Sequence, residues 1–324
     1  MTKLATPVVL VAAALLGACA SAPAQESPRV AEVVRTAAPL ANALSVTDPH
    51  GQRIELTGPA ERIVCLNGLC DDLAADLGLT PVGTSNPVLI SHPALLGDAG
   101  RAVPEVPGTF GGEDVEAIAG FKPDLVIGLP GVHDALRPAI EKFAPLWTAD
   151  PATWEESVGY LRALGALTGR ADRAVRAEEE FRGRLADAVA RTHGTAQAST
   201  KVLLMYGSAD AVGVDTTASL KGHLLGQLFT YPFPAKGTDL DTASNYSVEE
   251  LLARQPDVVF VYSLLFSTED RTLSSQLADN PVWQQIPAVR QERVHEVHAK
   301  LWGSGRGLRS LATVVDEALA KVPA

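Results

Sequence analysis

Short apolar runs alternate with amphipathic segments along most of the chain. Runs typical of buried strands occupy residues 62–67, 81–85, 123–129, 201–207, 257–262 and 293–298. Helical periodicity or helix start and stop signals mark residues 71–77, 153–192, 220–228, 273–285 and 307–322. A hairpin is predicted before the first run, because two alternating segments flank the turn-forming sequence of residues 48–51. Strands that alternate with helices predict an α/β fold of mostly parallel sheets covered by helices.

Two stretches of the chain share one plan. Residues 116–129 and residues 249–262 each begin with Glu, continue as a short helix, and pass through Pro-Asp into an apolar strand. This repeat is far longer than the 20–50 residues of a solenoid unit. We therefore expect two similar lobes.

One long amphipathic segment separates the two repeats. Its apolar positions recur at steps of three and four residues, as at Ala174, Ala177, Phe181, Leu185 and Val189. A helix of about 22 residues is about 33 Å long at 1.5 Å per residue, which is enough to join two lobes. The predicted organisation is an N-terminal lobe at 44–168, a bridging helix at 169–193 and a C-terminal lobe at 194–324.

The N-terminus has the features of an export signal. Lys3 precedes an uncharged, mostly apolar stretch that ends in Leu-Gly-Ala-Cys at Cys19. The stretch is shorter than the roughly 20 residues that cross a bilayer. We expect residues 1–18 to be a cleaved signal peptide and Cys19 to carry lipid, as in bacterial lipoproteins. An ordinary signal peptide that happens to contain a cysteine is the alternative.

Residues 19–43 are then predicted to hold the lipidated cysteine and a flexible tether, because residues 20–42 are rich in Ala, Pro and Ser. The formal net charge of −11 argues against nucleic acid as a partner. Two other cysteines exist, Cys65 and Cys70. In an oxidising compartment they can form a disulfide, or both can be buried free thiols, and the sequence leaves these alternatives open.

The order of these features resembles a known family. The lipoprotein signal, the hairpin before the first strand, the paired helix-Pro-Asp-strand units and the bridging helix are similar to periplasmic binding proteins of iron–siderophore and cobalamin ABC importers. The resemblance covers residues 44–322. It implies a monomer without a cofactor, with a ligand cleft between the lobes and an ABC permease as partner. It also implies that Glu116 and Glu249, at matching positions of the two lobes, dock onto arginines of that permease.

Ligands of open α/β lobes lie beyond the carboxyl ends of the strands, and this rule selects the candidate binding residues. Aromatic rings with polar tips suit a hydroxamate, catecholate or macrocyclic ligand, and fixed positive charge suits an anionic chelate. In the family that the chain resembles, an aromatic residue often lies at this point before the last helix, and this favours Trp302 as a ligand contact. The candidates are Asn67, His92, Arg101 and His133 of the first lobe and Tyr206, Tyr246, Tyr262, Trp302 and Arg306 of the second.

A ferric siderophore is the favoured ligand, and cobalamin, haem or a bare metal ion are the alternatives within the same fold. His295 and His298 are three apart on a strand and face opposite sides, which argues against a joint metal site. A secreted hydrolase is the second alternative, although the chain has neither a G-x-S-x-G elbow nor a Walker A loop. The glycines of residues 303–307 lack the third glycine of a dinucleotide-binding loop. We therefore expect a binding protein and no enzyme.

Overall fold

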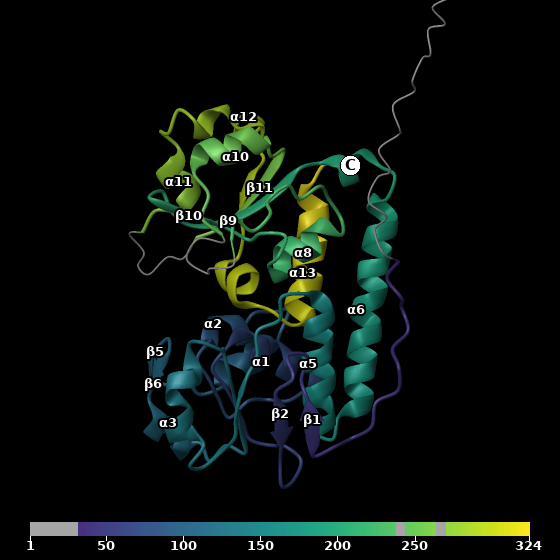
Figure 1. The fold of residues 1–324 in the computed structure, drawn as a ribbon, viewed down its shortest axis with the longest axis vertical. Helices are drawn as coiled ribbons and strands as arrows, with labels where there is room; N and C mark the ends of the chain where they lie inside the picture. The colour runs from purple at the N-terminus through teal and green to yellow at the C-terminus, as the bar shows by residue number, and fades with distance from the viewer. Residues whose placement is uncertain (1–31, 238–243, 264–269) are drawn as a thin grey trace, which may run out of the picture. The chain divides into compact units, whose positions relative to one another are not determined.

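The computed structural model describes residues 32–237, 244–263 and 270–324. The predicted signal peptide and Cys19 lie outside the described residues. Residues 32–324 form one compact unit. Within the part of this unit that the structure describes, two four-stranded sheets carry most of the helices on their faces (Figure 1).

The first sheet is fully parallel and lies in the N-terminal half. Its strand order is β4 (Gly83–Thr84), β3 (Ile63–Cys65), β7 (Leu125–Gly128) and β8 (Leu146–Thr148). The central strands β3 and β7 are completely buried, as expected for a parallel sheet with helices on both faces. The helices are α1 (Gly68–Leu77), α2 (Pro87–Ile90), α3 (Val115–Gly120), α4 (Arg137–Ile140) and α5 (Trp154–Leu167). Two hairpins accompany them, β1 (Ser45–Thr47) with β2 (Arg53–Glu55) and β5 (Gly108–Thr109) with β6 (Gly112–Glu113).

The second sheet repeats this arrangement. Its order is β10 (Ala211–Val214), β9 (Val202–Ser208), β11 (Val258–Tyr262) and β12 (Val294–Glu296), and only β10 is antiparallel. The helices are α7 (Ala196–Ser199), α8 (Leu220–Gly226), α10 (Val248–Arg254), α11 (Leu273–Leu277), α12 (Pro287–Arg290) and α13 (Leu308–Lys321). The parallel order β9-β11-β12 matches β3-β7-β8, and the predicted repeats are α3–β7 and α10–β11. The expectation of two similar lobes is confirmed.

The predicted bridging helix is α6 (Ala171–Thr192), which packs against α5 and α13. Gly169, at a φ of 69°, ends the preceding helix where the sequence predicts a break. One expected helix is divided, because the segment at 273–285 forms α11 and a separate 3-10 turn, Trp283–Gln285. Pro281 lies between them, and a proline has no backbone N–H with which to continue a helix.

Residues 33–42 differ from the predicted flexible tether. They form no helix or strand, yet they run antiparallel along α6, and we call them the N-terminal strap (Figure 1). Arg35 pairs with Asp187 at 2.6 Å, and the Asn42 side chain accepts a hydrogen bond from the Ala171 amide at 3.2 Å. The strap therefore contacts both ends of the bridging helix.

A buried carboxylate organises the middle of the strap. Glu178 of α6 is 3% exposed and pairs with Arg162 and Arg182, each at 2.7 Å. Arg162 donates in turn to the carbonyl oxygens of Ala38 and Pro39. Because a buried charge is retained only when it is paired, Glu178 fixes both arginines and through them the strap.

Contacts between α1 and α13 hold the two lobes together. Asp72 of α1 accepts hydrogen bonds from the backbone amides of Arg306, Gly307 and Ser310, each at 3.0 Å. These amides open α13, so a helix of the second lobe receives its N-terminal cap from the first. Gly307 permits this approach, since a Cβ there would lie 2.3 Å from the Asp72 Cβ.

Candidate functional site

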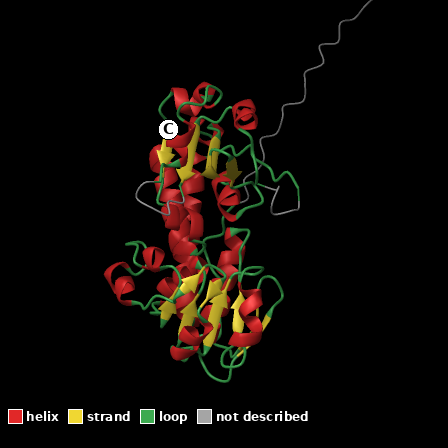
Figure 2. Cartoon of the chain, turned by 90° about the vertical axis from the view of Figure 1, so that its left-hand side faces the viewer, coloured by secondary structure: helices red, strands yellow, loops and turns green. Residues whose placement is uncertain are grey.

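The carboxyl ends of the two sheets face each other, as the strand arrows in Figure 2 show. This is where the sequence places the candidate residues. An ion pair lies where the two ends meet. A guanidinium nitrogen of Arg306, which precedes α13, is 2.9 Å from a carboxylate oxygen of Asp150, which is two residues after β8. We take the strand ends around this pair as the candidate ligand site.

Two stacked tyrosines lie on the second-lobe side of this site. Tyr206 is in β9 and Tyr262 ends β11, and the parallel register places them directly opposite each other. Their ring centroids are 5.1 Å apart with an interplanar angle of 15°. Tyr262 donates to an Asp215 carboxylate oxygen at 3.0 Å, and Tyr206 donates to Ser244 at 3.2 Å. The sequence predicted both tyrosines, and the structure brings them together.

Burial raises the pKa of both phenols, and the nearby Asp215 carboxylate raises the pKa of Tyr262 further. Both therefore remain protonated at neutral pH. A neutral phenol offers an aromatic surface and a hydrogen bond, whereas a phenolate would be needed to ligate iron directly. The pair thus presents an aromatic surface and hydroxyl groups to an organic ligand.

Lys221 is a charged residue of this neighbourhood that the sequence did not single out. It follows the Ser219 cap at the start of α8 and is 2% exposed. Burial, followed by the charge of Arg306, lowers the pKa of Lys221 to about 8, whereas Asp215, Asp72 and Asp150 act in the opposite direction. Because a lysine on an amphipathic helix is usually solvated, sequence alone gives no signal for this position.

Asn67 lies at the end of β3 and holds the strand ends in place. Its side-chain amide donates to the carbonyl oxygens of Gly128 at 2.6 Å and Ala149 at 3.0 Å, and its oxygen accepts from the Cys70 amide at 2.9 Å. These bonds use the polar atoms of a side chain that is 5% exposed. The predicted ligand residue therefore has a positioning role in the structure.

The predicted disulfide cysteines are bonded to each other. Cys65, at the end of β3, and Cys70, in the first turn of α1, form a disulfide. Of the two alternatives that the sequence leaves open, the structure contains the disulfide. It fixes the strand–helix connection on which Asn67 lies.

Two predicted ligand residues are in the hydrophobic core. The Trp302 side chain is 0% exposed, stacks on Phe260 at 5.0 Å and donates to Glu317 at 2.7 Å. Tyr246 is 3% exposed, and its hydroxyl donates to the Pro234 carbonyl. Both rings are buried against other side chains, so the expectation that they face the ligand is corrected. Position near a strand end indicates depth along the sheet but not the direction of the side chain.

The candidate histidines also separate. His133 is 0% exposed, lies 3.1 Å from Glu113 and accepts the Leu129 amide, so it is a structural residue rather than a ligand contact. His92 is partly exposed and packs against His298, with ring centroids 4.7 Å apart. The partner of His92 is therefore a histidine of the other lobe. Among the described residues, no group of three or more His, Cys, Asp or Glu side chains is placed to hold a metal ion.

Arg101 is at the surface and pairs with Asp98. The two predicted docking residues are exposed and lie in equivalent turns. Glu116 is in the first turn of α3 after the Asp114 cap, and Glu249 is in the first turn of α10 after the Ser247 cap. Both carboxylates also favour the positive end of their helix, so their position fits a local role and a docking role equally.

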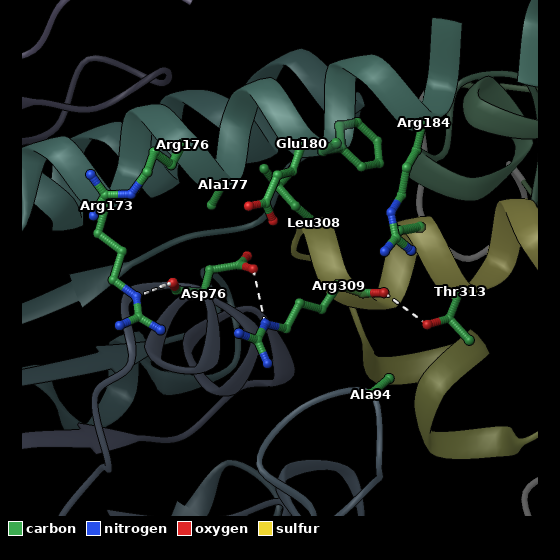
Figure 3. A pocket seen from close by; sticks show the side chains of 12 residues that line it. Asp76, Ala94, Arg173, Arg176, Ala177, Glu180, Arg184, Leu308, Arg309 and Thr313 are labelled. Atoms are coloured by element: carbon green, nitrogen blue, oxygen red, sulfur yellow. Dashed lines mark hydrogen bonds and ion pairs between the residues drawn. The ribbon is translucent and has the colours of Figure 1, made fainter. Parts of the chain in front are cut away.

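A pocket of about 500 Å³ lies elsewhere, between α1, α6 and α13. Figure 3 shows charged side chains of α6 opposite Asp76 and Arg309, which are joined at 3.1 Å. The pocket contains none of the predicted ligand residues, and its charged lining residues are Asp76, Arg173, Arg176, Glu180, Arg184 and Arg309. Because it lies among helices and away from the strand ends, we do not assign the ligand to it.

Comparisons with known proteins agree with this architecture. Residues 63–301 match the model of the periplasmic binding protein family. The Fe(3+)-citrate-binding protein YfmC of Bacillus subtilis is 24% identical over 86% of this chain and 85% of its own. The Fe(3+) dicitrate-binding periplasmic protein FecB of Escherichia coli is 24% identical over 82% and 86%.

A solved structure with the same fold is that of the triscatecholate siderophore binding protein FeuA from Bacillus subtilis, complexed with ferri-bacillibactin. It has a TM-score of 0.71 and 17% identity over 86% of this chain and 97% of its own. No helix among the residues that the structure describes has the length and apolar character to span a bilayer. The expectation of a binding protein rather than an enzyme is confirmed at the level of the family. This chain belongs to the periplasmic binding protein family.

Proposed function

We propose that the protein is the substrate-binding component of an ABC importer and that it captures an iron(III) chelate of the siderophore or citrate type. The observation that carries the proposal is the stacked Tyr206–Tyr262 pair beside Arg306, where the carboxyl ends of both sheets meet. Neutral rings pack against the organic part of a chelate, and the guanidinium group attracts its negative charge. The relatives named for iron(III) citrate and the neighbour named for a catecholate siderophore support this ligand class.

The test is a titration of protein lacking residues 1–19, followed by its intrinsic fluorescence. The ligands are ferric citrate, ferric hydroxamates, ferric catecholates, cobalamin, haem and divalent metal ions. We expect a response to at least one ferric chelate and a loss of affinity of tenfold or more in Tyr206→Ala. Phe143→Ala removes an aromatic side chain that is 38% exposed and precedes β8, at the opposite edge of the first sheet, and it serves as the control. Responses confined to cobalamin, haem or bare ions would contradict the proposal.

The permease contact follows from the two exposed glutamates. We propose that Glu116 and Glu249 bind basic residues of the membrane partner. Cells carrying Glu116→Ala with Glu249→Ala should lose chelate uptake, while the purified variant keeps its ligand affinity. Glu61→Ala with Asp279→Ala also removes one exposed acid from each lobe and should leave uptake unchanged. Reduced ligand affinity in the first variant would place the two glutamates in the fold or the ligand site instead.

We further propose that the chain is exported and held at a membrane through lipid on Cys19. Two relatives are described as lipoproteins, the putative ABC transporter substrate-binding lipoprotein YhfQ and the probable siderophore-binding lipoprotein YfiY of Bacillus subtilis. Labelled palmitate should be incorporated into the wild-type chain and not into Cys19→Ala, which should appear in the soluble fraction. Label retained in Cys19→Ala would contradict the assignment.

A further inference from the structure

The Lys221 side chain is buried without a partner. It is 2% exposed, and its ammonium group has neither a hydrogen bond nor an ion pair among the residues that the structure describes. An ammonium group carries three donors, and burying it unpaired is costly. A charge maintained under these conditions points to an anion that arrives with the ligand.

The carboxylates whose charges raise the pKa of Lys221 all have other hydrogen-bond or ion-pair partners. Asp215 accepts from Ser219 at one oxygen and from Tyr262 at the other. Asp72 uses both oxygens to cap α13, and Asp150 pairs with Arg306 at 2.9 Å. These are the acidic groups whose charges act on Lys221, and Arg306 is the cationic one. None of these carboxylates forms a hydrogen bond or ion pair with the ammonium group, so its three donors have no acceptor among the residues that the structure describes.

Lys221 and the tyrosine pair belong to the same site. Asp215 links them directly, because it contacts both the Tyr262 hydroxyl and the Ser219 cap that starts α8. The charge of Arg306 also acts on both Tyr206 and Lys221. A ligand that contacts the tyrosine pair therefore lies near the start of α8, where Lys221 is the second residue.

We propose that Lys221 binds a free carboxylate of the iron chelate, and that the site thereby selects polycarboxylate chelates over hydroxamate chelates. This inference rests on the proposed function. A narrow carboxylate can reach a nearly buried ammonium group, whereas the flat ring of a catecholate cannot, and its oxygens are occupied by iron. Hydroxamate chelates also use their oxygens on the metal, and they carry no free carboxylate. A charge-assisted hydrogen bond formed in this water-poor position is stronger than one at the surface.

The experiment measures the affinity of the lipid-free protein for ferric citrate and for ferric desferrioxamine B, a hydroxamate chelate. Lys221→Met keeps the length of the side chain and removes its charge, and we expect it to weaken ferric citrate binding tenfold or more. Any binding of ferric desferrioxamine B should change less than threefold. Lys221→Arg should restore most of the citrate affinity. Lys236→Met removes a second-lobe lysine that already pairs with Glu250 and should have no effect.

The pH dependence gives a second measurement that needs no variant to fold. Loss of the proton above a pKa of about 8 removes the positive charge of Lys221. Wild-type affinity for ferric citrate should therefore fall between pH 7 and 9. The same titration of Lys221→Met shows how much of the change belongs to the chelate itself.

The outcomes separate the two proposals. Wild-type protein that binds no ferric chelate overturns the proposed function and this inference together. If the wild type and Lys221→Met bind ferric citrate with equal affinity, this inference alone is overturned. If Lys221→Met does not fold, a wild-type citrate affinity that is constant from pH 7 to 9 overturns it as well.

Discussion

Replacing Asp72 with alanine tests whether the lobes depend on the cap that α1 provides to α13. The substitution removes three hydrogen bonds of 3.0 Å to backbone amides that open α13. Loss of an ordinary N-cap costs about 1 kcal/mol, and each buried amide left without an acceptor costs about 1 kcal/mol or more. We therefore expect a loss of about 3 kcal/mol in the free energy of unfolding.

Urea denaturation measures this loss. With a slope of about 3 kcal/mol per molar, the midpoint should fall by roughly 1 M. Hydrogen exchange gives the local readout, since the amides of Gly307 and Ser310 should exchange faster than in the wild type. Asp98→Ala removes a carboxylate whose side chain is 90% exposed, and it is the matched control, with an expected change of less than about 0.5 kcal/mol. A midpoint for Asp72→Ala that equals that of Asp98→Ala would refute the reasoning.

Three further predictions concern stability. Burial outweighs the charge of Arg309 and raises the pKa of the Asp76 carboxyl to about 7 from an ordinary 3.8. Between these two pH values the folded protein holds a proton that the unfolded chain has released. The free energy of unfolding is therefore highest below about pH 4 and falls by up to about 1.4 kcal/mol per pH unit as the pH rises toward 7. Asp76→Asn should flatten this dependence in urea melts from pH 4 to 8, and an unchanged slope would contradict the assignment. Reduction of the Cys65–Cys70 disulfide should lower stability by about 2 kcal/mol, because the closed loop is short, and Cys65→Ser should then be insensitive to reductant. Glu178→Gln should lower the free energy of unfolding by about 2 kcal/mol and make the N-terminal strap more sensitive to protease, which mass spectrometry of the cleavage products would show. An equal rate of strap cleavage in the wild type would contradict the role of Glu178 in holding the strap.

The sequence predicts those parts of the fold that depend on local pattern. The bridging helix is recognisable because its apolar stripe has a period of its own, and the two lobes are recognisable because the Pro-Asp turns recur. Pro281 also indicates the division of the segment at 273–285, because a proline has no backbone N–H with which to continue a helix.

The site was predicted less well, because a chain position does not give the direction of a side chain. Tyr206 and Tyr262 were selected by their place at strand ends, and the structure stacks them; the same rule selected Trp302, which turns into the core. Lys221 was missed because its burial depends on elements distant in sequence. The strap was missed for a similar reason, since its partners lie on helices more than a hundred residues away.

The strap has a mechanical consequence. It runs antiparallel to α6, and its contacts extend from Arg35 at Asp187 to Asn42 at Ala171. A force applied at residue 32 toward the N-terminus of the chain is therefore directed along α6. It loads these bonds together, in shear. The hairpin of β1 and β2, which follows the strap, would carry load only after the arginine contacts had given way. Such a force would therefore act first on the bridging helix, through which it reaches α5 and α13.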